Sequence, residues 1–593
     1  MAASTEPQFV DPLVSFPIID PTRQIRLLFL SSGSQQSITC RLSVVSVNEP
    51  PPYEALSYVW GSAEDLQVIT IDDHAFRITH NLYTALNHLL LPDGAVRVLW
   101  IDAICINQSD LAERSQQVRL MSHIFSGATN VVAYLGRPYP GLFEAMEFLT
   151  IAAGGQQSHI DRLTERPDCN IRKVCSALIS FFNRPWWGRI WTVQEPIVAR
   201  KVSFQFERLE IDSDVVRRGI YNIVTSRIRA PFEFAELDPT SGESLSTAFT
   251  KMSMLSLTYT GSSLLNALGA FQNRSSGDPR DKIYSLMGLF PESDQVVSID
   301  YRISTEQLFQ DFTMAWIRKH QDLRVLSHLH NPARRAQKGL PSFAVDWSYR
   351  PPIRSINALH NRTLLQNEAF DASKGSRAIW HLDPTGYVRA NGFVFDSIGA
   401  VGAERVLEFG SPWSARFKTL QGIVDMACER GGNNHQEQEQ TLTVIRYTLC
   451  MDCKQEAGVY SRLQGGEDER TLQAWWDSAF NASAPSRADR LAGERGPIET
   501  TVWIASLERS FVFTDGGRMG LAPDWCKPGD AIAIMGGGAV PMVLRPVGEV
   551  AAQEGDTPVF EVVGEAYIHG VMDGQAFGAR GRSESNFDDI YLV

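Results

Sequence analysis

The chain has 593 residues, of which 44% are hydrophobic and 21% are charged, a composition typical of a globular rather than a disordered protein. Its formal net charge is −13, and no basic stripe with interleaved aromatic residues offsets it, which argues against nucleic-acid binding. No apolar run approaches the ~18–20 residues of a membrane span, residues 1–13 lack the pattern of a secretory signal, and the eight cysteines are thinly spread, so we expect a cytoplasmic protein with reduced thiols.

The first 205 residues alternate between strand and helix patterns, which predicts an α/β domain. Thr79 precedes a helical pattern, and Asp110 with Glu113 fits a capping pair for a second helix. Because helices separate the later strands, the sheet is expected to be parallel and wrapped by helices. The segments that predict strands are residues 25–30, 38–45, 68–78 (as a hairpin), 96–101 and 131–135.

Beyond residue 205 the pattern becomes mostly helical, and the clearest helix is expected at residues 305–319. Two polar stretches, residues 431–440 and 481–497, are predicted to be flexible insertions. Towards the end of the chain, short apolar runs alternate with Gly and Pro, which predicts a small all-β domain. The predicted parts are an α/β domain at 1–205, a helical region at 206–330, a mixed α/β region at 331–500 and a β domain at 501–593.

The signatures of the common enzyme classes are absent. We find no phosphate-binding Gly-x-x-x-x-Gly-Lys, no His-Glu-x-x-His, no nucleophile elbow and no Gly-x-Gly-x-x-Gly. The single Cys-x-x-Cys at residues 450–453 has no second pair at metal-ligand spacing. The sequence therefore predicts no metal site.

Three aromatic-rich segments of the first domain form the candidate site. Ligands of a parallel sheet bind beyond the carboxyl ends of its strands. Trp60, Gly61 and Asp102 each follow a predicted strand, so they lie at this edge if those strands are neighbours. Glu195 lies there too if its helix begins at the same edge. The three segments are residues 53–61, 99–108 and 184–195.

In the third segment, Trp187, Trp191 and Glu195 are spaced four residues apart, which predicts one face of a helix. A carboxylate flanked by aromatic rings suits a flat, cationic or polyhydroxylated ligand. In the alternative interpretation, the tryptophans belong to the core and Asp102 caps the following turn. The residues alone leave both interpretations open.

The same segments resemble the fungal heterokaryon incompatibility (HET) domain. Its blocks run Ala-Leu-Ser-Tyr-x-Trp-Gly, then Leu-Trp-Ile-Asp-x-Ile-Cys-Ile-Asn-Gln, then Arg-x-Trp-Thr-x-Gln-Glu, and all three occur here in this order. The resemblance continues downstream and covers most of the chain apart from the insertions. The downstream segments that carry it are residues 278–289, 341–348, 520–523 and 567–574.

The HET domain in turn resembles the Toll/interleukin-1 receptor (TIR) domain, which has a flavodoxin-like parallel sheet. Some TIR domains hydrolyse NAD with one glutamate at the head of a helix, in a pattern similar to residues 189–195. This resemblance implies that Glu195 is the catalytic carboxylate, that NAD is the substrate and that no cofactor or metal takes part. The residues that it places around the substrate are Tyr58, Trp60, Gly61, Asp102 and Trp191.

Pro196 departs from the family pattern, which usually has an aliphatic residue after the glutamate. A proline disfavours helical geometry in the preceding residue and removes one helix hydrogen bond. We therefore expect Glu195 to lie at a kink, which aims its carboxylate either into the pocket or out of it.

Three functional hypotheses follow. The first is a fungal self/non-self effector that causes cell death by cleaving NAD, which needs an ionised Glu195 facing the sheet edge. The second is a non-catalytic module that signals by self-association or through an allelic or NLR-like protein partner. The third is an accessory protein or enzyme of a fungal biosynthetic pathway, which predicts a roomy apolar pocket with a different acid/base set.

Overall fold

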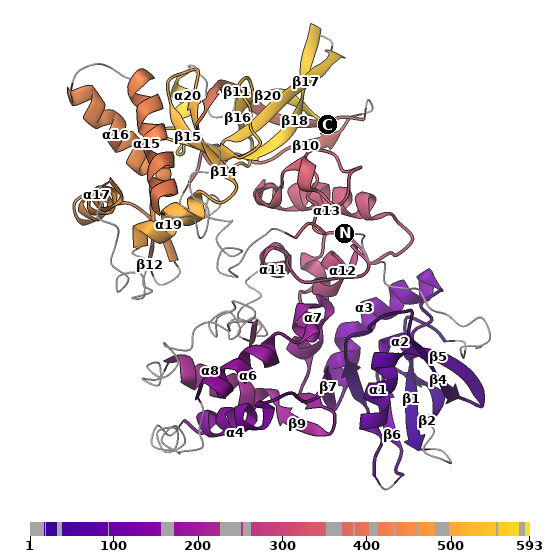
Figure 1. Cartoon of the computed structure of the whole chain (residues 1–593). Helices are drawn as coiled ribbons and strands as arrows, with labels where there is room; N and C mark the ends of the chain where they lie inside the picture. Colours follow the sequence, from indigo (N-terminus) through magenta and orange to yellow (C-terminus); the bar gives the residue numbers. More distant parts are fainter. Residues whose placement is uncertain are drawn as a thin grey trace. The chain divides into compact units, whose positions relative to one another are not determined.

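A computed structural model of the chain describes residues 17, 19–32, 38–92, 94–155, 171–225, 251–252, 263–350, 370–383, 386–402, 413–430, 435–456, 459–480, 497–552, 555–579 and 587–593. These residues divide into two compact units (Figure 1). The first contains the described residues up to Thr305 together with Arg350, and the second contains the others. Both units combine helices with a sheet, so the chain is a mixed α/β protein.

The first unit is built on a nine-stranded sheet with the order β5-β4-β2-β1-β6-β3-β7-β8-β9. Its four strands β6, β3, β7 and β8 are parallel, whereas β1 is antiparallel to β6 and β9 is antiparallel to β8. The predicted parallel sheet is therefore wrong for much of the flanks, where short connections join the antiparallel pairs β1–β2, β4–β5 and β8–β9, although β2 and β4 are parallel. The strands are β1 Gln24–Ser32, β2 Ile38–Ser46, β3 Glu54–Ser57, β4 Leu66–Ile71, β5 His74–Thr79, β6 Arg97–Trp100, β7 Asn130–Gly136, β8 Val202–Phe206 and β9 Leu209–Asp212.

The parallel centre of this sheet has a point at which the strand order reverses. Numbered along the chain, its strands are β3, β6, β7 and β8, and their order across the sheet is 2-1-3-4, as in flavodoxin-like sheets. From β3 the chain adds β6 on one side and then β7 on the other. Ligands of such sheets bind outside the carboxyl ends of the two strands at the reversal, which here are β3 and β7.

Helices connect the strands of the first unit, and α7 contacts both α3 and α12. The helix predicted after Thr79 is α1, which buries Leu82, Ala85, Leu86 and Leu89. The helices are α1 His80–Leu89, α2 Asp102–Cys105, α3 Leu111–Gly127, α4 Leu142–Ala153, α6 Ile171–Phe182, α7 Trp191–Val198, α8 Ser213–Thr225, α11 Leu264–Phe271, α12 Asp281–Met287 and the 3-10 helices η2 Pro185–Gly188 and η3 Glu292–Asp294.

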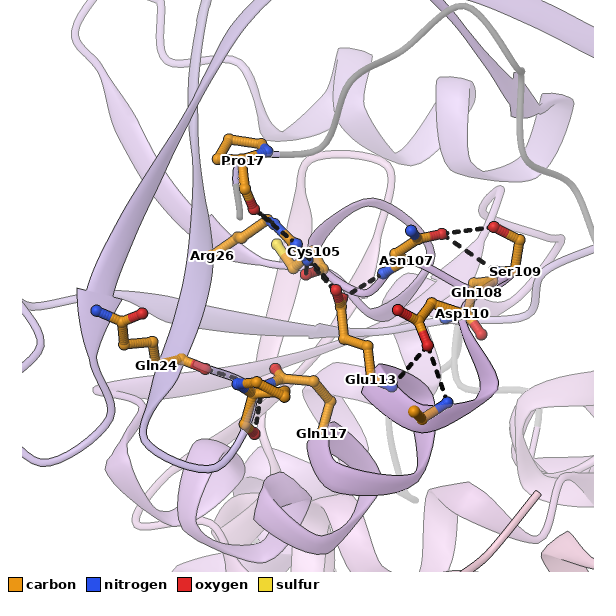
Figure 2. Close-up of polar contacts among 12 residues, drawn as sticks. Pro17, Gln24, Arg26, Cys105, Asn107, Gln108, Ser109, Asp110, Glu113 and Gln117 are labelled. Atoms are coloured by element: carbon orange, nitrogen blue, oxygen red, sulfur yellow. Dashed lines mark hydrogen bonds and ion pairs between the residues drawn. The ribbon is translucent and has the colours of Figure 1, made fainter. Parts of the chain in front are cut away.

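A buried ion pair ties the first strand to α3 (Figure 2). Arg26 on β1 is 1% exposed, and its guanidinium donates to both carboxylate oxygens of Glu113, at 2.6 and 3.0 Å. The remaining donors of Arg26 reach the backbone carbonyls of Pro17 and Cys105. Glu113 also accepts a hydrogen bond from the backbone N–H of Asn107. Two opposite charges with these hydrogen bonds tolerate burial, whereas either charge alone does not.

The capping prediction for α3 is confirmed for Asp110 and wrong for Glu113. The Asp110 carboxylate accepts hydrogen bonds from the backbone N–H groups of Ala112 and Glu113. Glu113 does not reach back to close a capping box, because its oxygens are bound by Arg26 and Asn107.

The second unit contains a sheet in which β16, β17, β18, β20 and β11 form a closed ring, because β11 also pairs with β16. The long strand β11 also pairs with β10 and β14. It comes from the predicted mixed region, and it completes a ring whose other strands come from the predicted β domain. The strands of this unit are β10 Trp380–Leu382, β11 Val388–Val401, β12 Cys453–Glu456, β13 Val459–Arg462, β14 Arg509–Thr514, β15 Met519–Pro523, β16 Ala531–Met535, β17 Met542–Ala552, β18 Gly555–Glu565, β19 Tyr567–Ile568 and β20 Asp588–Leu592.

The helices of the second unit confirm the prediction at 305–319, which is α13. They overturn part of one predicted insertion: residues 435–440 belong to α16, because their glutamate and glutamine residues favour helix. Residues 431–434 and 481–496 lie outside the described residues. No helix in the described ranges is both long and apolar enough to cross a bilayer. The helices are α13 Thr305–His320, α15 Trp413–Arg430, α16 His435–Leu449, α17 Glu467–Phe480, α19 Pro497–Ala505, α20 Gln575–Ala579 and the 3-10 helices η4 Arg324–His328 and η5 Pro332–Arg334.

Removing one partner of the Arg26–Glu113 pair should destabilise the first unit more than removing both. Arg26→Met leaves a buried carboxylate without a counter-charge and should cost about 3–5 kcal/mol, whereas Arg26→Met/Glu113→Leu should recover most of that loss. Hydrogen exchange of the β1 and α3 amides in the full chain measures this. The control is Arg302→Met, which breaks an ion pair whose arginine is 68% exposed and should leave the stability nearly unchanged, because solvent screens exposed ion pairs. A double variant as unstable as the single one would contradict the expectation.

Candidate functional site

The three aromatic-rich segments meet at the carboxyl edge of the parallel strands. Ser57 is the last residue of β3. Asp102 lies two residues beyond Trp100, the last residue of the neighbouring strand β6. The helix α7 begins at Trp191 and brings Glu195 to this edge, where its side chain contacts Ser57. Segments that are far apart in the sequence thus form one polar cluster.

Glu195 is the buried carboxyl of this cluster. It is 5% exposed, and Ser57 Oγ donates a hydrogen bond to its Oε2. Ser57 Oγ in turn accepts a hydrogen bond from the indole N–H of Trp186 at 2.7 Å. Sequence reasoning did not single out Ser57 or Trp186, although both lie inside the recognised segments.

Burial raises the pKa of Glu195 to about 7. The positive charge of Arg189 and the hydrogen bond from Ser57 act against this rise, while the negative charge of Asp102 adds to it. A carboxyl with a pKa near 7 gains and loses its proton near neutral pH. Such a perturbed group beside a strand edge is typical of functional sites.

Asp102 is fixed by neighbours on both sides of the edge. Its Oδ2 accepts a hydrogen bond from the indole N–H of Trp60 at 2.8 Å, and its Oδ1 accepts one from the backbone N–H of Ala103 at 2.8 Å. The Gln108 side chain donates to the Asp102 carbonyl at 2.9 Å. Asp102 therefore orders the turn after β6, as the structural interpretation expected, and also orients Trp60.

Tyr58 and Gly61 contribute through the backbone. The Tyr58 side chain is 3% exposed, and its carbonyl accepts a hydrogen bond from the guanidinium of Arg189. Gly61 has φ +83, and a Cβ at this position would lie 2.8 Å from Nδ2 of Asn81. A side chain at position 61 would thus meet both backbone strain and a close neighbour.

The predicted helix face is wrong for Trp187, whereas Trp191 and Glu195 do lie four residues apart in α7. Trp187 belongs to η2, which ends at Gly188, and α7 begins only at Trp191. Between them the chain leaves helical geometry because the backbone of Gly188 and Ile190 bonds to Ser275. Trp187 is buried among aromatic rings, whereas Trp191 is half-buried at the start of α7.

Pro196 lies within α7, which continues to Val198. The Glu195 side chain points towards Ser57, and it is not among the residues that line the cavity described below. At the first turn of α7, Thr192 Oγ1 lies within hydrogen-bond distance of the carbonyls of Trp186 and Arg189, to which its single hydroxyl hydrogen can donate.

A cavity of about 370 Å³ lies at the reversal of strand order between β3 and β7. Its volume is in the ~300–1,000 Å³ range of small-molecule sites. None of the six predicted site residues lines it, but Trp186 does, and the same indole is bonded to Ser57. The lining residues are Val59, His80, Asn81, Thr84, Tyr134, Leu135, Gly136, Arg137, Arg184, Pro185 and Trp186.

The edge has no metal-binding character in the part of the chain that the structure describes. There, no group of three or more His, Cys, Asp or Glu side chains is arranged to hold a metal ion. The groups available for chemistry are the carboxyl of Glu195, the fixed carboxylate of Asp102 and the basic side chains around the cavity.

Comparisons with known proteins find similarity to heterokaryon incompatibility (HET) proteins in two parts of the chain. Residues 53–195 match the family described as "Heterokaryon incompatibility protein (HET)", and residues 504–593 match the "Het-6 beta-barrel domain". The chain is 26% identical to "Heterokaryon incompatibility protein 6, OR allele" of Neurospora crassa, and the match covers 98% of this chain and 97% of that relative. No solved structure matches the chain. The resemblance to TIR domains stays a prediction.

The pKa of Glu195 predicts a pH-dependent stability. With a pKa of about 7 in the folded chain and ~4.3 in the unfolded one, the carboxyl favours folding fully below about pH 4. This contribution to the free energy of unfolding should fall by roughly 3 kcal/mol as the pH rises to about 7.

Calorimetric unfolding of the wild type and Glu195→Gln from pH 4 to 8 measures this effect. The stability of the wild type relative to the variant should decrease with rising pH, because glutamine does not titrate. Glu292→Gln, at an exposed position, is the matched control. A stability difference that stays constant with pH would show that Glu195 is not perturbed.

Gly61→Ala should destabilise the first unit by about 1–2 kcal/mol through its left-handed backbone, and more if Asn81 cannot move away. Asn81 lines the cavity and donates to the Val59 carbonyl at 3.3 Å. Thermal unfolding measures the loss. Gly188→Ala is the control, because a Cβ there would meet no atom within 4 Å. Equal stability of the two variants would contradict the expectation.

Proposed function

We propose that this HET-domain protein acts in the cytoplasm of a fungus in self/non-self recognition, and that it causes cell death by cleaving NAD at the edge formed by β3, β6 and α7. The HET-domain match and the nearly full-length similarity to a heterokaryon incompatibility protein support the biological role. One observation supports the chemistry: Glu195 is a buried carboxyl with a pKa of about 7 beside a cavity of ligand size.

The reaction needs one well-placed anion. When the bond between nicotinamide and ribose breaks, nicotinamide leaves as a neutral molecule with the bonding electrons, and positive charge develops on the ribose. An ionised Glu195 stabilises this oxocarbenium-like transition state. Water then adds to the ribose carbon and releases a proton, which gives ADP-ribose. No general acid is required for the leaving group.

The positive charge of the substrate helps to ionise Glu195. In the free chain, burial keeps about half of the carboxyl protonated at pH 7. The nicotinamide ring of NAD is cationic, and a nearby cation favours the carboxylate form. Binding of the substrate is thus expected to lower the pKa of Glu195 and to prepare the anion that the reaction uses.

In this mechanism, the access of the substrate to Glu195 is the regulated step. Its side chain is 5% exposed and hydrogen-bonded to Ser57, which is itself held by Trp186. A substrate reaches the carboxylate only after this contact opens. We assign the opening to self-association or to an allelic or NLR-like protein partner, so that the separate chain is silent.

The enclosure of Glu195 also favours a second candidate function, that of a non-catalytic signalling module. In that case the Ser57–Glu195 hydrogen bond only fastens α7 to the sheet. The protein would then act through an assembly formed by the HET domain, and no bond of NAD would be broken.

Nicotinamide release by the full chain separates the two functions. The purified protein is incubated with NAD both dilute and at crowded concentration, and release is followed by chromatography. We expect release from the crowded protein that increases as the pH rises through about 7, since Glu195 must be ionised, and a loss of at least about 100-fold in Glu195→Gln. Glu292→Gln is expected to behave as the wild type.

Ser57→Ala provides a second test of the role of Glu195. The hydrogen bond from Ser57 lowers the pKa of Glu195, so its removal should move the pH profile of release to higher pH. An absence of release from the crowded wild type would refute NAD cleavage and leave the signalling module.

A further inference from the structure

The charged side chains that line the cavity between β3 and β7 are all basic. His80, Arg137 and Arg184 line it, and no aspartate or glutamate does. This contrasts with the formal charge of −13 for the whole chain. His80 lies 3.6 Å from Asp65, but Arg137 and Arg184 form no ion pair with any carboxylate among the described residues. The cavity therefore holds two guanidinium groups whose charge the described part of the protein does not neutralise.

Arg184 is held in place without a counter-charge. Its guanidinium lies over the Tyr139 ring, 4.6 Å from the centroid, and its Nη2 donates to the Arg137 carbonyl at 2.8 Å. Its Nε is buried and has no hydrogen-bond acceptor among the described residues. Burial also lowers the pKa of Arg184, which means that its charged form lacks compensation. A guanidinium fixed by stacking and short of an anion is suited to phosphate.

The remaining wall is suited to the uncharged parts of a nucleotide. Tyr134 is 6% exposed, and its hydroxyl is hydrogen-bonded to Nδ1 of His88 at 2.7 Å, which fixes the ring. Val59 supplies apolar surface and Asn81 supplies an amide, while Trp186 borders the cavity from a fully buried position. Flat apolar walls with a few polar groups are typical of sites for nucleotides and similar small molecules.

We propose that this cavity binds a phosphate-bearing nucleotide whose phosphate contacts Arg184 and Arg137. The position agrees with the general rule for open parallel sheets, since the cavity lies where the strand order reverses. Binding here does not depend on cleavage of NAD, and it involves none of the residues predicted from the sequence.

A nucleotide in the cavity is placed to act on Glu195 through two side chains. Trp186 lines the cavity, its indole donates to Ser57, and Ser57 donates to Glu195. Movement of this indole on binding would release Ser57 and hence the carboxyl. Occupation of the cavity and exposure of Glu195 are therefore linked by a short chain of hydrogen bonds.

Isothermal titration of the full chain with ADP-ribose tests the proposal, with adenosine as the ligand that lacks phosphate. ADP-ribose should bind and adenosine should bind at least about tenfold more weakly, because hydrogen bonds to charged groups carry much of the affinity. Arg184→Gln should weaken ADP-ribose about tenfold or more. Arg137→Gln, at an exposed position where folding is not at risk, should weaken it in the same direction. Arg172→Gln, an exposed arginine on α6 that does not line the cavity, is the control.

The outcomes separate this inference from the proposed function. The absence of ADP-ribose binding, equal binding of adenosine, or binding that neither cavity variant weakens would overturn the nucleotide site. Binding that depends on Arg184 and Arg137, without nicotinamide release from the crowded protein, would support the site and refute only NAD cleavage. Release of nicotinamide together with binding that is independent of both arginines would refute only the site.

Discussion

The hydrogen bond between Ser57 and Glu195 joins positions 138 residues apart, and the arrangement of the first unit converges on it. A carboxyl at 5% exposure needs a polar partner, because an unsatisfied buried group is strongly unfavourable. The partner is available only because β3 ends at the carboxyl edge of a parallel sheet. The helix that carries Glu195 must also begin beside that edge, and the contacts of α7 with α3 and α12 place it there.

The two carboxyl groups at this edge of the sheet differ in their surroundings. On one side, Asp102 accepts two hydrogen bonds and stays fixed beside Trp60. On the other side, burial favours the protonated form of Glu195 near neutral pH. Around the reversal of strand order, by contrast, the cavity is lined by basic side chains and by no aspartate or glutamate. This combination of a carboxyl edge beside a cavity lined by basic side chains is not visible in the net charge of the chain.

Much of the first unit follows from local patterns in the sequence. The alternation around Asp72 and Asp73 predicts the β4–β5 hairpin, and both residues have the positive φ that a tight turn requires. The long apolar runs predict β6 and β7, and parallel strands bring their carboxyl ends to one edge. The meeting of the three aromatic segments is a consequence of this rule, so it could be anticipated without knowledge of any side-chain contact.

The parts that could not be anticipated depend on contacts between distant residues. Spacing alone pairs Trp187 with Glu195, yet the backbone bonds to Ser275 end the helical geometry, and Trp186 is the residue that reaches Ser57. The cavity combines the start of α1 with the end of β7 and with η2, three places that no single motif connects. The resemblance to a family points to the right segments, but it does not indicate which side chains face the open space.

The Arg26–Glu113 pair also restricts how this chain can diverge. Arg26 and Glu113 also bond to backbone atoms of Pro17, Cys105 and Asn107, and residue types other than proline supply the same backbone groups. These hydrogen bonds therefore do not depend on which side chains stand at 105 and 107. They do depend on the side chains at 26 and 113, which form the ion pair. In an evolutionary lineage either position can lose its charge only when the other does, so the two sites are expected to covary as one inherited unit.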